Sequence, residues 1–189
     1  MKEIKFKAHS YNDLDKRAKQ KAKEKVLWLM IGNNVIKGKE IIKDDLDCFE
    51  DLKFKSAHYY DIGPRCCGVK VYGKLSITEL LDWEIKRNKY TTVPTQEAMD
   101  DGDIFYVKIS SSEKYMYNIQ LIANKRLNKQ QKELKEFLYT IVYRSFNELR
   151  THLVSKINKH LMSVSMNSEV AKYIKDNNLL FLKNGFILE

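Results

Sequence analysis

The sequence predicts an α+β protein with a mostly antiparallel sheet, several helices packed on it, and one long helix in the C-terminal half. Three observations support this fold class. Apolar residues recur every three or four positions over residues 129–162, which is the helical period. Apolar and polar residues alternate in short segments before that helix, which is the strand period. The 189 residues include only 7 Gly and 2 Pro, which favours long regular elements.

The predicted long helix is the dominant element. No Pro or Gly interrupts it, and at ~1.5 Å per residue it would be about 50 Å long. An apolar stripe of that length is hard for one small domain to cover, so the sequence also predicts a homodimer formed through this helix. The residues of the stripe are Leu134, Phe137, Leu138, Ile141, Val142, Phe146, Leu149, Leu153, Ile157 and Leu161.

The segment before the sheet is predicted to hold a strand and two helices. Residues 2–8 alternate as in a half-buried strand. Asn12 or Asp13 would cap a first helix that ends near residue 31, before a Gly-Asn-Asn sequence. A second amphipathic helix is expected over residues 39–51. The buried stripe of the first helix would be Leu14, Ala18, Ala22, Val26, Leu29 and Met30.

The middle of the chain changes to the strand period. Strands are expected over residues 54–61 and 67–75, followed by a helix over 78–86, a long loop over 89–103, and a hairpin with arms at 105–109 and 115–121.

After the long helix, a small cap over residues 168–189 would hold a short helix and a hairpin turning at Asn184-Gly185. Together these elements predict one domain over residues 1–189.

Composition limits the classes of protein. The formal net charge is +9, which fits a nucleic-acid partner, although a lysine-rich composition also arises when lysine fills solvated positions. The three cysteines suggest no disulfide framework. No leader and no apolar run of membrane-spanning length is apparent, so we expect a cytoplasmic protein without a membrane partner.

Both ends of the chain resemble one group of proteins. Tyr11 and the sequence Leu14-Asp-Lys-Arg-Ala-Lys-Gln-Lys-Ala22 resemble the opening of a group of small, mostly uncharacterised bacteriophage proteins, whose pattern is L-S-x-x-A-K-x-K-A. Tyr59-Tyr-Asp-Ile-Gly63 and Phe181-Leu-Lys-Asn-Gly185 are similar to a middle segment and to the closing F-x-x-[DN]-G hairpin of the group. The Cys66-Cys67 pair and the net positive charge of this chain depart from the pattern of that group. The resemblance implies a phage or prophage protein acting inside a bacterium, and it supplies no catalytic residues.

Three clusters of residues have side chains of the kinds that bind metals or catalyse reactions. His58, Cys66 and Cys67 could bind zinc, but adjacent cysteines cannot easily both reach one tetrahedral ion, so buried strand cysteines are favoured. His152 and His160 lack the metalloprotease spacing and fit the polar border of the apolar stripe. Asp100, Asp101 and Asp103, with Glu113 and Lys114, could form a divalent-metal nuclease site or a solvated loop. No phosphate-loop, dinucleotide-binding or serine-elbow motif is present. We therefore expect no enzyme, no catalytic residue, no metal and no cofactor.

A set of lysines and tyrosines is the candidate binding surface. Aromatic side chains with basic neighbours can stack on bases and contact phosphates, can anchor a protein interface, or can simply be ordinary strand composition. The candidate residues are Lys16, Arg17, Lys19, Lys21, Lys23, Lys70, Tyr72, Lys74, Tyr106, Lys108, Lys114, Tyr115 and Tyr117.

Two hypotheses of function follow from this surface. In the first, the chain is a phage protein that blocks a host protein or ribonucleoprotein complex by steric occlusion, most specifically an anti-CRISPR-like inhibitor. In the second, the same lysines bind nucleic acid directly, with a steep dependence on salt.

Overall fold

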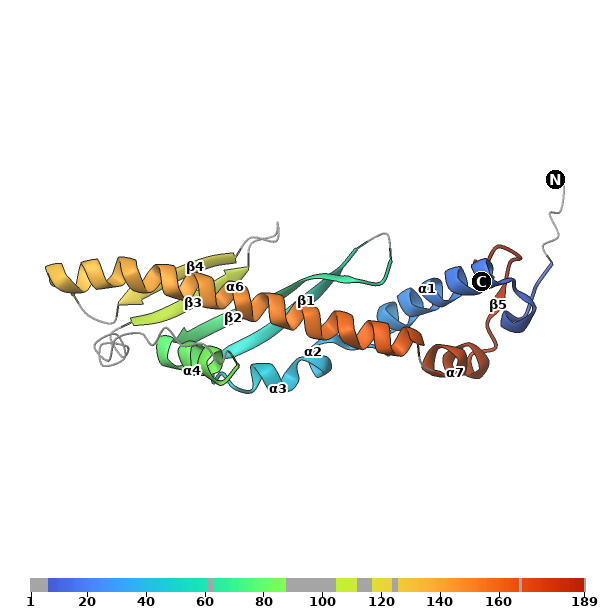
Figure 1. The fold of residues 1–189 in the computed structure, drawn as a ribbon, viewed down its shortest axis with the longest axis horizontal. Coiled ribbons are helices and arrows are strands. Elements are labelled where there is room, and N and C mark those ends of the chain that lie inside the picture. Colours follow the sequence, from blue (N-terminus) through green and yellow to red (C-terminus); the bar gives the residue numbers. More distant parts are fainter. Residues whose placement is uncertain are drawn as a thin grey trace. The chain divides into compact units, whose positions relative to one another are not determined.

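The computed structural model describes residues 7–60, 63–87, 105–111, 117–123, 126–166 and 168–188, and it has the predicted α+β class (Figure 1). The chain divides into two compact units, which we name and describe separately. The sheet unit comprises Gly38–His58 and Cys66–Lys156, and the terminal unit comprises Met1–Lys37, Tyr59–Arg65 and Ile157–Glu189. The expectation that the whole chain is one domain stays a prediction.

The sheet unit is built on four strands in the order β1-β2-β3-β4, namely β1 (Leu52–Tyr59), β2 (Cys66–Ser76), β3 (Phe105–Ser111) and β4 (Tyr117–Ala123). The last residue of β1 already belongs to the terminal unit. β2 pairs antiparallel with β3, and β3 with β4, which confirms the predicted hairpin. Alternate residues such as Val71, Val107 and Leu121 are buried, so one face of the sheet forms a core.

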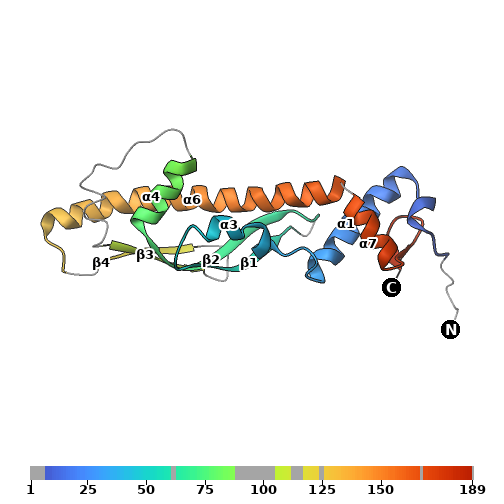
Figure 2. The ribbon, with the colours of Figure 1, turned by 90° about the horizontal axis from the view of Figure 1, so that it is seen from below.

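Helices α4 (Ile77–Arg87) and α6 (Lys129–Met166) lie on the same side of this sheet (Figure 2). α4 starts directly after β2 because Ser76 and Glu79 form a capping box: the Glu79 N–H donates to Ser76 Oγ at 2.9 Å, and the Ser76 N–H donates to Glu79 Oε2 at 2.9 Å. Leu80 and Trp83 of α4 are buried.

α6 confirms the predicted long helix and extends four residues beyond it. A capping box formed by Asn128 and Gln131 begins it, with the Gln131 N–H donating to Asn128 Oδ1 at 2.8 Å. Its residues up to Lys156 belong to the sheet unit and the remainder to the terminal unit. Phe137 was wrongly placed in the buried stripe, since it is 57% exposed. At about 100° per residue it lies roughly 140° round the helix from Val142, which is at the centre of the buried face.

The predicted second helix over residues 39–51 is wrong. The segment forms two single turns, α2 (Gly38–Ile41) and α3 (Lys43–Leu46), separated at Ile42, whose φ of −107° and ψ of 9° leave the helical region. The Ile42 side chain is fully buried, as are Leu46 and Phe49 nearby. Tertiary packing of these three side chains outweighs the local helical period here.

The terminal unit contains η1 (Tyr11–Asp13), α1 (Lys16–Gly32), α7 (Ser168–Asp176), β5 (Leu180–Phe181) and β6 (Ile187–Leu188). α1 starts later than predicted, because Asp15 is its cap and accepts a hydrogen bond from the Ala18 N–H at 2.8 Å. Asp13, one of the two predicted caps, instead closes a capping box with Ser10 around η1. Most of the predicted first strand lies outside the described residues, and His9 forms an isolated bridge to Phe181.

The predicted C-terminal hairpin is present and packs on α1. Gly185 has a φ of 86°, and a Cβ at this position would lie 2.2 Å from the Ala18 carbonyl oxygen. Ala18 and Ala22 are buried, so their small size allows this close approach. Over the described residues, no helix is both long enough and apolar enough to cross a membrane.

Candidate functional site

The candidate site is the face of the sheet that does not form the core. Strand residues that alternate with the buried ones point to this side. Lys53, Lys55, Tyr72, Lys74 and Lys108 are exposed there, while Lys70 and Tyr106 are half-buried. We call this surface the lysine face; its residues are Lys53, Lys55, Lys70, Tyr72, Lys74, Tyr106 and Lys108.

Two lysines of this face lie directly opposite each other. Lys74 of β2 and Lys108 of β3 are Cα partners, and Gln120 of β4 continues the row. Directly opposed side chains have Cβ atoms ~5 Å apart, and like charges at that separation lower the stability of a sheet. The Lys74 ammonium also lies 5.3 Å from the centre of the Tyr106 ring, in a cation–π contact.

The four strands themselves carry no acidic side chain. The strands β1, β2, β3 and β4 contain five lysines and neither Asp nor Glu. Burial and the positive charge of Lys70 together lower the pKa of the His58 imidazole in β1. The lysines of this face are therefore concentrated on one side of a hydrogen-bonded sheet.

The structure brings together five of the predicted site residues, which are Lys70, Tyr72, Lys74, Tyr106 and Lys108. Tyr117 is the first residue of β4, and only its backbone position is described. Lys114 and Tyr115 lie outside the described residues, so their prediction stays open. Lys53 was not predicted to belong to this surface, although the alternation in Leu52-Lys-Phe-Lys55 places it on the same side of β1 as Lys55.

The predicted helical residues Lys16, Arg17, Lys19, Lys21 and Lys23 are on α1, in the terminal unit. Several lysines of this helix contact that unit's own groups. Lys19 lies over the Tyr11 ring at 6.0 Å, Lys21 over the Phe186 ring at 4.6 Å, and the Lys23 ammonium donates to the Ser165 carbonyl at 3.5 Å. These contacts give the lysines a structural role, so α1 is a weaker candidate than the lysine face.

Of the candidate metal ligands, His58 lies in β1 and Cys66 and Cys67 lie in β2. Among the described residues, no group of three or more His, Cys, Asp or Glu side chains could hold a metal ion. Cys66 is buried in β2, and burial raises the pKa of its thiol to about 11. The Cys67 thiol donates to the His58 carbonyl oxygen at 3.4 Å. The Asp100 cluster, with Glu113 and Lys114, lies outside the described residues.

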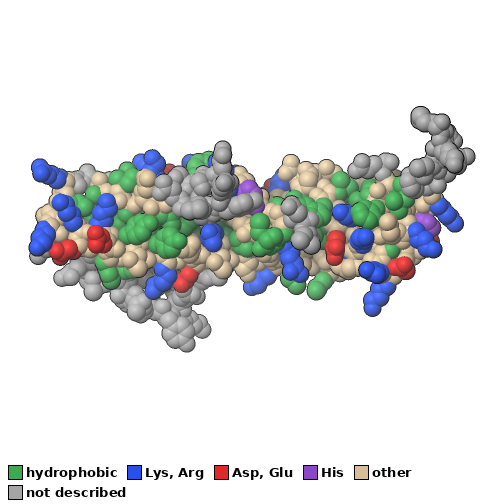
Figure 3. Space-filling view, turned by 90° about the horizontal axis from the view of Figure 1, so that it is seen from above, with side chains coloured by type: hydrophobic (Ala, Val, Ile, Leu, Met, Phe, Trp, Pro, Cys, Tyr) green, Lys and Arg blue, Asp and Glu red, His purple; other side chains and the backbone are tan. Residues whose placement is uncertain are grey.

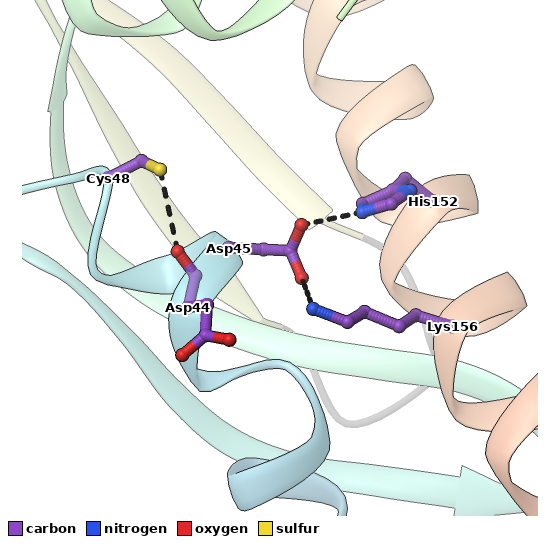
Figure 4. A network of polar contacts seen from close by, with 5 residues as sticks. All are labelled: Asp44, Asp45, Cys48, His152 and Lys156. Atoms are coloured by element: carbon purple, nitrogen blue, oxygen red, sulfur yellow. Dashed lines mark hydrogen bonds and ion pairs between the residues drawn. The ribbon is translucent and has the colours of Figure 1, made fainter.

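A second polar feature joins α3 to α6 within the sheet unit (Figure 4). The Asp45 carboxylate accepts from His152 Nε2 at 2.6 Å through one oxygen and from Lys156 Nζ at 2.6 Å through the other. Burial alone would raise the pKa of the Asp45 carboxyl, but these hydrogen bonds outweigh it and hold that pKa below its usual range. His152 is thus an anchored border residue of the apolar stripe, whereas His160 is exposed.

A cavity of about 540 Å³ adjoins this cluster and is lined by Asp45, Cys48, Trp83 and His152, among others. A thiol beside an imidazole can act as a nucleophile with its base, and Cys48 and His152 both line this cavity. The Cys48 thiol instead points to the Asp44 carbonyl oxygen at 3.4 Å, on the far side of Asp45 from the imidazole (Figure 4). The cluster is arranged as a structural link between two elements.

Comparisons with known proteins do not suggest a function for this chain. No family model, no curated protein and no solved structure matches this chain. The function must therefore be argued from the lysine face itself.

Proposed function

We propose that this chain is a non-enzymatic protein that binds an anionic surface of a host macromolecule through its lysine face and blocks that surface by occlusion. One observation carries the proposal: Lys74 and Lys108 are directly opposed in a sheet whose strands contain no Asp or Glu. A fold alone gains nothing from opposed lysines, which cost stability of about 0.2–1 kcal/mol. Such local conflicts are expected at functional sites.

The mechanism needs no reactive group. The positive face attracts an acidic protein surface, which speeds encounter more than it tightens the final complex. Tyr72, which is 45% exposed, supplies an amphipathic anchor of the kind enriched at interfaces. Once bound, the rigid sheet covers the surface that the host component needs. In its most specific form, which rests on the phage resemblance, the target is a bacterial defence complex such as a CRISPR ribonucleoprotein.

The first experiment compares two variants that change the net charge equally. Lys55→Glu, Lys74→Glu and Lys108→Glu reverse the lysine face, and the control reverses Lys159, Lys172 and Lys175, which are exposed residues of α6 and α7. Tagged proteins are used as bait in nuclease-treated bacterial lysate. We expect specific host components to bind the wild type and the control and to be lost with the reversed face. Equal capture by all three proteins contradicts the proposal.

A functional assay tests the blocking step. The wild type and both variants are expressed in bacteria that carry a CRISPR defence, and phage plating efficiency is measured. Restored plating with the wild type and the control, but not with the reversed face, supports the specific form. Binding without any change in plating would retain occlusion of some host macromolecule and reject a CRISPR target.

A second candidate function uses the same face to bind nucleic acid. The observation that favours it is the exposed Tyr72 ring between the lysines of β2, since stacking on a base and contact with phosphates need this combination. Fluorescence anisotropy with labelled single-stranded and duplex DNA and RNA at 50 and 200 mM salt distinguishes the two. Tight binding that weakens steeply with salt, by a log–log slope of about −0.7 to −0.9 per phosphate, supports this candidate. Absence of binding favours a protein target.

A further inference from the structure

The two edges of the sheet are protected differently. β1, at one edge, carries Lys53 and Lys55, and exposed lysines are a common device against edge-to-edge pairing. β4, at the other edge, has the sequence Tyr-Asn-Ile-Gln-Leu-Ile-Ala and is the only one of the four strands without a lysine. It also contains no Pro. Among the described residues, no further strand pairs with its outer edge, and an unpaired edge presents backbone N–H and C=O groups to another chain.

An exposed aromatic pair of α6 belongs to the same side of the unit. Tyr139 and Tyr143 are 42% and 50% exposed, and their rings stack with centres 6.3 Å apart. Tyr143 precedes His152 by nine residues, which at ~3.6 residues per turn places it on the opposite flank of the helix. His152 faces α3 through Asp45. In Figure 1, α3 and α4 lie below α6 and β4 lies above it, so the tyrosine flank is on the side of β4.

Figure 3 looks onto this side of the molecule and shows hydrophobic side chains gathered in a broad patch, on the left where Figure 1 has β4 and the first half of α6. An uncharged strand edge and a helix flank that carries two exposed tyrosines therefore adjoin each other. An apolar patch of this kind marks an interaction site in a chain that is otherwise rich in charge.

We propose that a second copy of this chain covers the patch, with the two β4 strands paired antiparallel and the two α6 tyrosine flanks in contact. A two-fold axis through Gln120 places Ile119 of one copy opposite Leu121 of the other, on the face that each copy already buries beneath α6. The eight-stranded sheet that results has a continuous core. Because the interface is isologous, the β4 strand of each copy forms its edge hydrogen bonds with the β4 strand of the other copy.

Charge and area indicate where a second copy can meet this chain. Two chains of net charge +9 repel each other over most of their surfaces, and β4 is the strand where like charges do not meet. A seven-residue strand is ~24 Å long, so pairing alone buries less than the ~800 Å² per partner typical of stable interfaces. The α6 flank supplies the remainder, which a short foreign peptide could not reach.

The experiment measures the mass of the full chain in solution by sedimentation velocity and native mass spectrometry. We expect the wild type at twice the 22.3 kDa chain mass. Gln120→Lys and Gln120→Glu each place like charges opposite each other across the two-fold axis, so each alone should be a monomer. An equimolar mixture of the two should recover the dimer, because opposite charges then meet. Tyr143→Arg, on the helix flank, should also give a monomer.

Tyr72→Lys is the matched control, since it adds the same charge on a central strand and should leave the dimer intact. Circular dichroism checks that each variant folds, because Gln120→Lys also lies opposite Lys108 within one copy. A monomeric wild type at tens of micromolar rejects the proposal. Dimers that persist in both Gln120 variants and in Tyr143→Arg place the interface elsewhere and reject it as well. The mass of the chain is measured here, whereas the test of the lysine face measures capture of host components, so the two proposals can fail separately. Gln120 lies in the row of Lys74 and Lys108, and Tyr143→Arg tests the dimer without changing that row.

Discussion

Asp45 shows how one carboxylate can hold two elements together. Its side chain is 16% exposed and bonds to both His152 and Lys156, so it fixes the short α3 turn against the long α6 helix. α3 has only four residues and could not persist as an isolated helix. We therefore attribute the position of α3 to this ion pair and to the buried side chains beside it.

Replacing Asp45 with Asn should lower the free energy of unfolding by about 1–3 kcal/mol at pH 7, since charge-assisted hydrogen bonds are lost. Because the pKa of the folded carboxyl lies below its unfolded value of about 3.9, the contribution is complete above that pH. It disappears as the pH falls through the folded-state pKa. Urea unfolding of both proteins at pH 7 and pH 3 measures this. Asp47→Asn, at an exposed neighbour, should change stability by less than about 0.5 kcal/mol.

Gly73 is required by the close approach of β2 to Asp51, the residue that precedes β1. Its φ is 136°, and a Cβ would lie 1.9 Å from the Asp51 carbonyl oxygen. Gly73→Ala should therefore cost about 2–4 kcal/mol, from backbone strain and steric overlap together. Gly68→Ala in the same strand is the control, since a Cβ there meets nothing within 4 Å. Thermal and urea unfolding should show a change within about 1 kcal/mol for this control; equal losses at both positions would contradict the steric explanation.

At the scale of elements, α6 carries the core of the sheet unit on one narrow stripe. Leu149 is fully buried, whereas Phe137, three turns earlier on the same helix, is largely exposed. Leu149→Ala should lower the free energy of unfolding by about 2–5 kcal/mol, because it leaves a cavity. Phe137→Ala should cost less than about 1 kcal/mol, although it removes more atoms. Chemical denaturation of the two variants compares them, and a larger loss at Phe137 would show that its side chain is buried in solution.

At the scale of the whole molecule, the positive charge comes from groups that do not titrate near neutrality. The chain has 34 Lys and Arg but only 4 His, and burial together with Lys70 keeps the pKa of His58 low. We expect the salt concentration that elutes the chain from a heparin column to be nearly the same at pH 6 and pH 8. The lysine-face variant should elute earlier than the matched control at both. A strong rise in retention at pH 6 would instead assign the binding to histidines.

The elements that the sequence predicted well are those whose signal is local. The period of α6, the alternation in β3 and β4, and the Asn184-Gly185 turn each depend on residues close in the chain. The lysine face was predicted in part for the same reason, because alternation places Lys70, Tyr72 and Lys74 on one side of a strand. The phage resemblance, the absence of catalysis and the identity of the target stay predictions.

By itself, the sequence determined the fold class, the long helix and the positive balance of the strands, because periodicity and composition are properties of neighbouring residues. Only the tertiary structure decided that Lys74 faces Lys108, that Asp45 joins α3 to α6, and that Phe137 lies outside the core. Strand register and helix rotation set these three features. Both depend on packing between segments far apart in the chain, which no local pattern encodes.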